Sequence, residues 1–438
     1  MFTKAPPSSA GFARAVFAEN LAGAPMGLTA VCSAHPLVLR AALAAARESG
    51  QIALIEATCN QVNQDGGYTG MQPADFVARV RGIAAEIGLP ADRLLLGGDH
   101  LGPQPWRNLP AADAMKNAET MVTAYVLAGF QKIHLDCSMR CADDPEILPE
   151  ATCAARAAIL ARAAEHALAP DAPRPIYVIG TEVPPPGGMG AGHKIVPTDP
   201  AHVGATWHAH KDAFAALGLE AAFARVCGIV VQPGLDFGNE SVVHFAPDAA
   251  RGLTNRAASL DGAVYEAHST DYQRPEAYAA LVRGHFAILK VGPAATFALR
   301  EGLYALDMLA GEILGRKAPK LRSVLETEML ANPAHWQGHY SGDADHVAWL
   351  RHFSWSDRIR YYWTAPAVER EQEALFEALD ACHWPQPLLS QYLPHDIDDL
   401  ASGRARPRCS DIVTRYVRRA LAPYYAASDP HLTLEKEC

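Results

Sequence analysis

The chain has 438 residues and a mass of 47.0 kDa; 49% of the residues are hydrophobic and 20% are charged. A chain of this length and composition buries a sizeable core, which excludes a protein that is disordered throughout. The formal net charge of −10 disfavours general nucleic-acid binders and binders of anionic membranes, because both classes are basic. We therefore expect one large folded domain with an appendage.

The sequence also indicates the cellular compartment. No apolar run approaches the ~18–20 residues of a membrane helix, and residues 1–23 lack the continuous apolar segment of a secretory signal. The nine cysteines are scattered and include no C-x-x-C pair, so we expect neither a disulfide framework nor a structural zinc site. These features predict a cytoplasmic protein.

Short apolar, β-rich runs alternate along the chain with longer alanine-rich stretches. The predicted strands, in chain order, span residues 27–35, 53–58, 94–100, 132–138, 176–184, 228–234, 263–272 and 287–294. Helices are predicted between them, at residues 36–50, 73–88 and 118–130 among others. The first and last of these three space their apolar residues three and four positions apart, as a helix packed on one face does.

Eight strand–helix units within about 290 residues are typical of a (β/α)8 TIM barrel. The alternative is an open, doubly wound sheet, which alternates in the same way. Such a sheet usually carries a glycine fingerprint after its first strand, whereas residues 32–36 read CSAHP. We therefore predict an α/β fold with a TIM barrel over residues 1–320. The alternation stops after residue 320, and a mainly helical C-terminal region packed on the barrel is predicted for residues 321–438.

Polar side chains collect at the C-terminal ends of the predicted strands, where barrel enzymes carry their active sites. Strand residues alternate between the inside and the outside of a barrel, so Ile133 and Leu135 should face the helices. The same alternation predicts a set of inward-facing or strand-terminal polar residues: Glu56, Asp99, His100, Lys132, His134, Asp136, Glu182, Gln232, Glu266, His268 and Lys290. The convergence of so many polar residues on one rim favours a site over a purely structural role.

The five carboxylates of this set outnumber its two lysines. Confined like charges raise carboxyl pKa values or require a cation. A divalent metal such as zinc or manganese is the simplest answer, and ligands of His/Glu/His type with an open position are typical of a catalytic site. We predict His100, Glu182 and His268 as ligands, with Gln232 or Asp136 as a further one. The alternative for any single histidine is a hydrogen-bonded core residue.

A phosphate site is predicted where the last strand runs into KVGPAATFALREGL. Gly292 and Pro293 open a helix whose first N–H groups are free, and such a helix end after the last barrel strands is a common phosphate seat. Lys290 would add a cation, and Ser269 and Thr270 would add hydroxyl donors. The alternative is a plain Gly-Pro turn.

Two loops and a helical histidine pair leave their roles open. The glycine-rich run at 184–194 matches no nucleotide-binding loop and reads as a lid over the barrel mouth or as a solvated loop. The amide-rich run at 60–71 suits sugar hydroxyls or turn capping. His208 and His210 are expected to be helical surface or packing residues.

Eight segments of the sequence together resemble one protein family. They are IEATCNQVNQDGGYTGM, LLGGDHLGP, KIHLDCSM, VIGTEVPPPGG, VVQPG, YEAHSTDYQ, HFAILKVGPA and SDRIRYYW. From about residue 27 to 394 the chain resembles the Z-type, or non-catalytic, subunits of tagatose-bisphosphate aldolase. Some members of that family are D-tagatose-6-phosphate 4-epimerases, which interconvert this sugar phosphate and D-fructose 6-phosphate. The resemblance implies a TIM barrel related to the metal-dependent class II aldolases. In those enzymes an Asp-His pair supplies an acid/base and a metal ligand, and Asp99-His100 matches this pair.

The implied reaction inverts C4 of a ketohexose phosphate. Direct removal of a proton from C4 would need prior oxidation, and no nicotinamide fingerprint is visible, so a retro-aldol route with the metal as Lewis acid is expected. Asp99 would remove the proton of the C4 hydroxyl, and Glu56 or Asp136 would be the second acid/base. The expected phosphate and substrate contacts are Lys290, Gly292, Ser269, Thr270, Arg358 and Glu266.

The family name leaves other functions open. The chain could be a non-catalytic subunit that stabilises a class II aldolase, with the aromatic-rich C-terminal region as the interface, or it could cleave tagatose 1,6-bisphosphate itself. A sugar kinase is least favoured, because no ATP-phosphate loop is visible. The expected partners are a small sugar phosphate and either further copies of the chain or an aldolase subunit, whereas nucleic acid and membrane are not expected.

Overall fold

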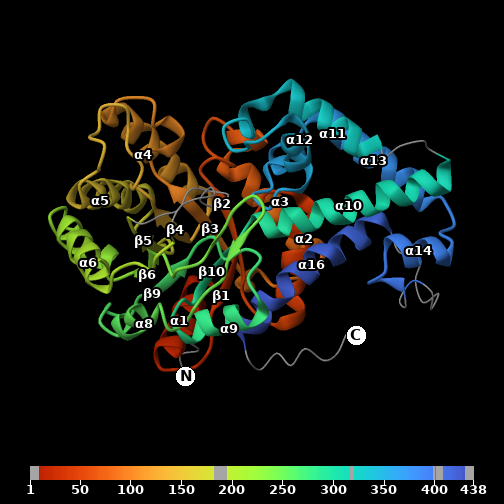
Figure 1. The fold of residues 1–438 in the computed structure, drawn as a ribbon. Helices are drawn as coiled ribbons and strands as arrows, with labels where there is room; N and C mark the ends of the chain where they lie inside the picture. Colours follow the sequence, from red (N-terminus) through yellow and green to blue (C-terminus); the bar gives the residue numbers. More distant parts are fainter. Residues whose placement is uncertain (1–8, 182–194, 316–319, 398–399, 401–407, 430–438) are drawn as a thin grey trace.

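Eight parallel strands close into a barrel in the computed structural model, which describes residues 9–181, 195–315, 320–397, 400 and 408–429 (Figure 1). The barrel strands are β1 (Leu28–Cys32), β2 (Ala53–Thr58), β3 (Leu94–Leu101), β4 (Lys132–Leu135), β5 (Ile176–Ile179), β6 (Val226–Val231), β9 (Val264–Ala267) and β10 (Ile288–Val291). Neighbours pair in the order β1-β10-β9-β6-β5-β4-β3-β2. The remaining pair, β7 (Asp236–Phe237) and β8 (Val242–Val243), is a short antiparallel hairpin after β6. The predicted TIM barrel is confirmed.

Helices surround the barrel and extend beyond it. The main ones are α1 (Ser9–Leu21), α2 (Pro36–Ser49), α3 (Pro73–Glu86), α4 (Ala111–Ala128), α5 (Glu150–Ala167), α6 (Pro200–Ala215), α8 (Arg251–Ala257), α9 (Pro275–Arg283), α10 (Pro293–Leu314), α11 (Lys320–Ala331), α12 (Ala344–Phe353), α13 (Pro366–Asp380), α14 (Gln386–Tyr392) and α16 (Cys409–Ser428). The helices expected at 36–50, 73–88 and 118–130 are α2, α3 and the second half of α4. His208 and His210 lie on α6, where His210 is buried and bonds the Thr206 carbonyl, as a packing residue does.

Local sequence signals explain where α2 begins and ends. The His35 side chain accepts the N–H of Leu37, and Pro36 stands at the first helical position, where its missing N–H costs nothing. Gly50 ends the helix with a φ of 69°, which only glycine adopts without strain.

The inside of the barrel has an apolar lower layer and a charged upper layer. The lower layer contains Leu54, Val178 and Ile288, and α1 seals it from below with Phe17. The upper layer lies toward the C-terminal strand ends and holds the ionisable residues described below. A site on this rim therefore rests on a packed floor, which keeps its side chains in fixed positions.

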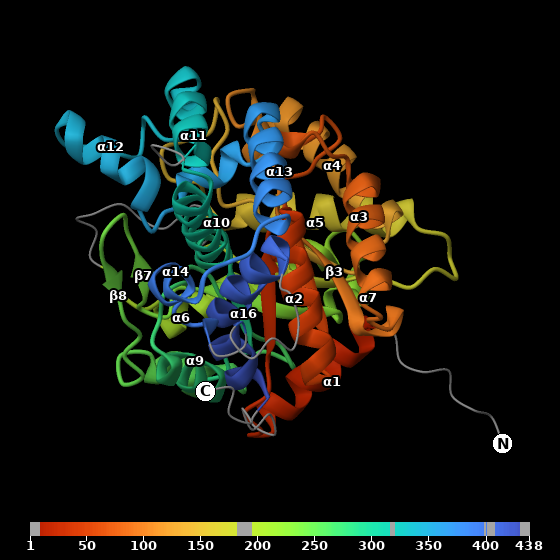
Figure 2. The same cartoon turned by 90° about the vertical axis from the view of Figure 1, so that its right-hand side faces the viewer.

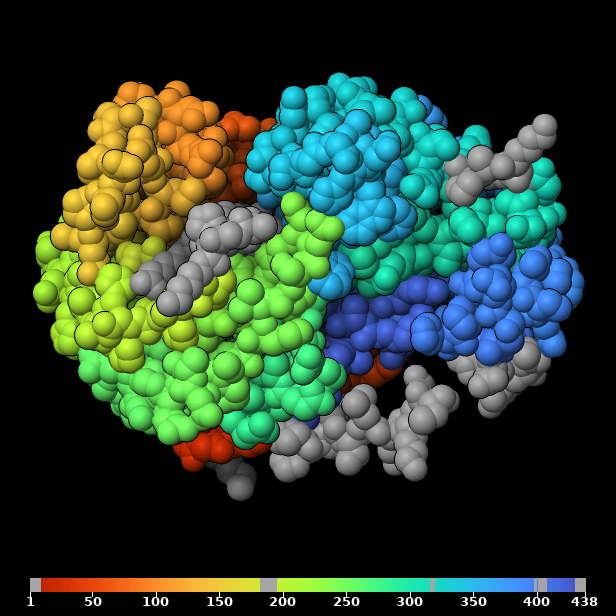
Figure 3. Space-filling view, viewed as in Figure 1, coloured from red at the N-terminus to blue at the C-terminus, as the bar shows by residue number. Residues whose placement is uncertain are grey.

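The C-terminal region completes the helical layer of the barrel. Helix α10 leaves the barrel after β10, and α16 returns to pack between α10, α2 and α9 (Figure 2). The Tyr425 hydroxyl donates to the Ala42 carbonyl on α2, and the Tyr424 hydroxyl donates to the carbonyl of Thr270 beyond β9. The remaining C-terminal helices form a lobe beside the barrel (Figure 3).

Two expectations from the sequence concern membrane helices and disulfide bonds. In the part of the chain that the structure describes, no helix combines the length and apolar character needed to cross a membrane. The eight described cysteines are all free thiols, as their scattered spacing predicted.

Candidate functional site

Two buried lysines hold the carboxylates of the upper barrel layer together. Lys132 is fully buried, and its Nζ lies 2.6 Å from Glu56 Oε1 and 2.6 Å from Glu266 Oε2. Lys290 Nζ lies 2.7 Å from Asp99 Oδ1 and also contacts Glu56. Burial lowers the pKa of both lysines, but the surrounding carboxylates outweigh it and raise both pKa values above the ordinary one. The two lysines therefore neutralise most of the excess negative charge that the sequence predicted. Lys290 is paired with carboxylates and is not free to bind the phosphate.

Glycine at position 97 makes this network possible. In the parallel register Gly97 stands beside Glu56 on the neighbouring strand. A Cβ on Gly97 would lie 2.7 Å from the Glu56 Oε1 atom, closer than real Cβ contacts come. The LLGGDH segment thus leaves the space through which Glu56 reaches Lys132.

Three imidazoles form a triangle above the lysines. The ring centroids of His100, His134 and His268 lie 5.0 to 5.4 Å apart. Each ring has one nitrogen bonded to a carboxylate: His100 Nδ1 to Asp136 at 2.8 Å, His134 Nδ1 to Asp99 at 2.9 Å and His268 Nε2 to Glu266 at 2.9 Å. Metal-binding histidines almost always have such a carboxylate or carbonyl partner on the nitrogen that does not bind the ion.

The donor set fits a divalent ion. Asp99, His134, Glu266 and His268 each offer one ligand atom, and these four atoms lie within 4.8 Å of one another. The Nε2 atom of His134 is buried and has no hydrogen-bond partner in the described structure. Burial lowers the pKa of His268 to about 4, so its ring is neutral at pH 7 and able to bind a metal. Sequence parity placed His134 inside the barrel but did not identify it as a ligand.

The predicted metal ligands lie in different places in the structure. His268 belongs to the group of four donors, and His100 lies beside it, with a pKa that Asp99 and Asp136 raise against the effect of burial. Gln232 does not join them, because its Oε1 accepts the N–H groups of Gly234 and Leu235 in the turn after β6. These bonds occupy the oxygen that would bind a metal, and a ligand role for Gln232 stays a prediction. Glu182 and the predicted lid at 184–194 lie outside the described residues.

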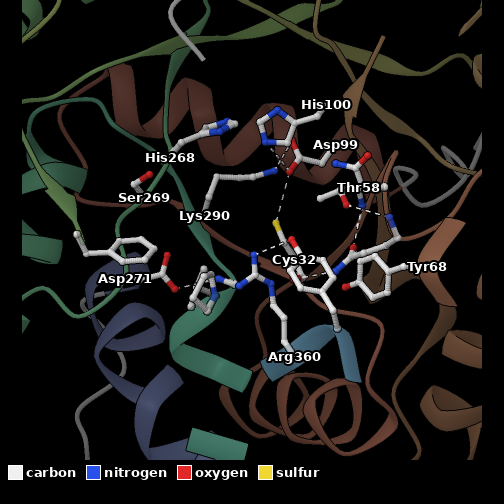
Figure 4. A pocket seen from close by; sticks show the side chains of 17 residues that line it. Cys32, Thr58, Tyr68, Asp99, His100, His268, Ser269, Asp271, Lys290 and Arg360 are labelled. Atoms are coloured by element: carbon white, nitrogen blue, oxygen red, sulfur yellow. Dashed lines mark hydrogen bonds and ion pairs between the residues drawn. The ribbon is translucent and has the colours of Figure 1, made fainter. Parts of the chain in front are cut away.

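A cavity of about 90 Å³ opens above the charged layer (Figure 4). Its lining residues come from the ends of five barrel strands, from the 60–71 run, from β7 and from the 356–363 segment: Cys32, Thr58, Asn60, Gln61, Tyr68, Asp99, His100, Phe237, His268, Ser269, Asp271, Lys290, Val291, Gly292, Pro293, Arg360 and Tyr361. Burial would raise the pKa of Asp99, but His100, Lys290 and the hydrogen bond from His134 outweigh it and hold this pKa well below its ordinary value. Asp99 is therefore ionised and faces the cavity as a candidate base.

Asp271 is a second carboxylate on the cavity wall that the sequence did not point to. Its Oδ1 accepts the N–H groups of Gly292 and Ala294 at 3.1 and 2.8 Å, and burial raises its pKa to about 6. The predicted phosphate seat at Gly292 is thus already occupied by the Asp271 carboxylate. Figure 4 shows Asp271 and Asp99 at opposite ends of the cavity.

The predicted hydroxyl and arginine contacts are also partly corrected. Ser269 lines the cavity, whereas the hydroxyl of the fully buried Thr270 donates to the Lys290 carbonyl at 2.5 Å. Arg358 donates to His339 at 3.0 Å and is not a lining residue, but Arg360, two positions later, is. Arg360 is therefore the arginine that the 356–363 segment places at the cavity.

The amide-rich run at 60–71 contributes both to the cavity wall and to turn capping. Asn60 and Gln61 line the cavity. Asn63 does not, because its Oδ1 accepts the N–H groups of Asp65 and Gly67 and so fixes the turn. The Gln61 amide also accepts the N–H of Thr58 at 2.9 Å, so Asn60 remains the candidate for sugar hydroxyls.

Comparison with known proteins decides the family. The family model described as "D-tagatose-1,6-bisphosphate aldolase subunit GatZ/KbaZ-like" matches residues 14–429. The chain belongs to the GatZ/KbaZ-like family. It is 51% identical to the D-tagatose 6-phosphate 4-epimerase of Agrobacterium fabrum (strain C58) over 94% of this chain and 97% of that protein. It is 45% identical to the D-tagatose-1,6-bisphosphate aldolase subunit GatZ of Salmonella dublin, over 95% and 99%.

A solved structure supports the same family. The crystal structure of a probable tagatose 6 phosphate kinase from Sinorhizobium meliloti 1021 aligns with a TM-score of 0.84 and 46% identity, over 92% of this chain and 100% of that one. The family predicted from the eight segments is confirmed, and the match extends beyond them at both ends.

Proposed function

We propose that this chain is a metal-dependent epimerase that interconverts D-tagatose 6-phosphate and D-fructose 6-phosphate by cleaving and reforming the C3–C4 bond. The observation that carries the proposal is the triangle of carboxylate-bonded histidines at a cavity that also holds an ionised Asp99. The 51% identical relative named as this epimerase supports the choice of substrate.

The metal site would be built from residues of two strands. His134 and His268 would supply ring nitrogens, and Glu266 would supply a carboxylate oxygen, with His100 close by. A divalent ion held there would act as a Lewis acid toward the sugar oxygens and stabilise negative charge on the C1–C3 fragment. The protonated Lys290 lines the same cavity and adds a fixed positive charge beside that fragment.

The two cavity carboxylates would divide the proton transfers between them. Asp99 takes the proton of the C4 hydroxyl, the C3–C4 electron pair passes to the C1–C3 enediolate, and C4 becomes the aldehyde of glyceraldehyde 3-phosphate. After the aldehyde has turned its other face, C3 attacks it, and Asp271 protonates the new C4 oxygen from the opposite side. Asp271 replaces the earlier candidates Glu56 and Asp136. Glu56 is held by Lys132 and Lys290, Asp136 is bonded to His100 and Ser138, and neither lines the cavity.

The phosphate would be held by the arginine of the 356–363 segment. Arg360 lies at the cavity, where a planar guanidinium matches phosphate oxygens. Ser269 and the amide of Asn60 would bind hydroxyls.

The decisive experiment is NMR of the product formed from fructose 6-phosphate by the wild type loaded with Mn²⁺ or Zn²⁺. Tagatose 6-phosphate is the expected product. Asp99→Asn and His268→Ala should each reduce turnover by at least ~10²-fold, because one loses the base and the other a ligand. Metal content should fall in the histidine variant. A wild type that binds metal but forms no tagatose 6-phosphate would refute the proposal.

A second candidate function is that of a supporting aldolase subunit. The observation that favours it is the 45% identical relative named as subunit GatZ. It predicts that the purified chain has no activity alone and raises the activity or stability of a class II aldolase when mixed with it. We rank it second, because such a role does not require the ionised Asp99 and the neutral His268 at an open cavity.

A further inference from the structure

A second cavity, of about 660 Å³, lies in the C-terminal lobe. Its walls come from α10, α11, α12, α14, the segment after α14, and α16. Figure 3 shows α16 (dark blue) at the back of a hollow between α10 and α14. The lining residues that matter here are Arg300, Tyr304, Arg322, Phe353 and Arg419. Neither the proposed epimerase chemistry nor the family match assigns a role to this cavity.

Arg300 is the unusual residue of this cavity. Its side chain is almost completely buried, at 3% exposure, and it makes no hydrogen bond or ion pair with the described residues. Its Nε atom is buried without a partner. Most buried arginines are paired, because an unpaired buried charge is costly.

Aromatic rings surround the guanidinium, and the carboxylates of Glu301 and Asp357 lie near enough to interact with its charge but form no hydrogen bond with it. Its central carbon lies 4.0 Å from the ring centroid of Phe297, 5.3 Å from that of Tyr304 and 5.2 Å from that of Phe353. Cation–π contacts offset part of the cost of burial, but they leave the N–H donors unused. The guanidinium is thus held rigidly in place with its hydrogen-bonding capacity free for a ligand.

The other charges of the cavity are of both signs. The exposed Arg322 places its guanidinium carbon 5.1 Å from the centroid of the same Phe353 ring. Arg419 also lines the cavity but is bonded to Asp396 at 3.2 and 3.3 Å. Two carboxylates face the cavity as well: Asp307 accepts the backbone N–H groups at the start of α11, and Glu301 stands beside Arg300.

We propose that this cavity binds a small phosphate ester. The phosphate would accept hydrogen bonds from Arg300 and Arg322, and the organic part would pack on Phe353 and Tyr304. A guanidinium fork matches phosphate oxygens well, and a dianion pairs with two arginines. The site is separate from the barrel cavity, since the two share no lining residue.

Phenyl phosphate is the probe that tests this site, with calorimetric titration of the full chain as the assay. We expect Arg300→Met to weaken one binding event by about 10- to 100-fold, the loss expected from charge-assisted hydrogen bonds. Arg360→Met, the matched variant at the barrel cavity, should leave that event intact. Phenol should not bind, because it lacks the phosphate.

Thermal unfolding separates a ligand site from a structural role. Arg300→Met replaces an unpaired buried charge with an apolar side chain, so the ligand-free variant should melt at or above the wild-type temperature. If Arg300→Met does not fold, Arg322→Met at the exposed position serves instead, with an expected loss of binding of at least ~3-fold from one removed cation. The proposal is overturned if phenyl phosphate does not bind, if its binding is unchanged in these variants, or if only Arg360→Met removes it. None of these outcomes depends on epimerase activity.

Discussion

Replacing Lys132 by methionine tests how the charged layer is held together. Methionine matches the lysine side chain as far as Cε but lacks the ammonium group that lies 2.6 Å from both Glu56 and Glu266. Removing one partner of a buried ion pair costs about 3–5 kcal/mol, because the remaining charges stay buried without compensation. An unfolding entropy of about 2.1 cal/mol/K per residue gives roughly 0.9 kcal/mol/K for the chain, so the melting temperature should fall by about 3–5 °C.

Urea unfolding measures this free energy, and two variants serve as controls. Lys211→Met removes an exposed lysine 3.2 Å from Asp261 and should cost at most about 1 kcal/mol. The double variant Lys132→Met with Glu266→Gln should lose less than the sum of the single losses, because it removes the charge left unpaired. A loss below about 1 kcal/mol for Lys132→Met, or additive losses in the double variant, would refute the reasoning.

The same variant has a defined pH dependence. Burial raises the pKa of Glu266, but Lys132, Lys290 and the hydrogen bond from His268 outweigh it and hold this pKa well below its ordinary value. A depressed carboxyl pKa stabilises the fold above the unfolded-state pKa of about 4.3, and this contribution is lost as the pH falls through the folded-state value. The stability gap between wild type and Lys132→Met should therefore be largest near neutral pH and narrow in acid.

Two further predictions concern the cavity. Gly97→Ala should displace the Glu56 carboxylate, because the new Cβ would lie 2.7 Å from Oε1. We expect the free energy of unfolding in urea to fall by about 1–3 kcal/mol and turnover to decrease. Wild-type stability together with wild-type turnover would contradict this prediction. Asp271→Asn should keep the contacts to Gly292 and Ala294, but its amide cannot donate the proton that the carboxylic acid would give to the substrate. Turnover of fructose 6-phosphate should fall by about 10²–10⁴-fold, and the decline in wild-type activity above a pH of about 6, where Asp271 loses its proton, should disappear. Because the raised folded-state pKa makes ionisation of Asp271 destabilising above that pH, the variant should be no less stable than wild type at pH 8, and a large loss of stability there would mean that the residue is mainly structural.

Strand parity was enough to predict the charged layer. Side chains alternate with a period of two in any strand, and a closed barrel turns one set inward, so Lys132, His134 and Glu266 could be placed from sequence alone. The predicted barrel followed from the eight repeats in the same way. Parity does not predict which carboxylate pairs with which lysine or histidine. These ion pairs depend on which strands are neighbours and on the space left by Gly97.

The cavity residues that the sequence analysis missed or misplaced lie beyond the ends of the strands. Asp271 lies beyond β9 in a turn where Ser269 and Tyr272 have φ values of 53° and 61°, so the strand alternation no longer applies. Arg358 and Arg360 lie in a 3-10 helix, in which residues two apart point in different directions, and the sequence offered no reason to prefer the second.

The packing of α16 also could not be predicted in detail. Its amphipathic pattern indicates a helix with one buried face, but not that this face would meet α2 and α9 and complete the barrel wall.

The most direct test of the account is the reaction of fructose 6-phosphate with the metal-loaded protein in D₂O, followed by NMR and mass spectrometry of the product. Cleavage and re-formation of the C3–C4 bond leave the hydrogens on C3 and C4 untouched, so the account predicts tagatose 6-phosphate without deuterium at either carbon. Deuterium at C4 would contradict the route, and unchanged fructose 6-phosphate would contradict the function itself.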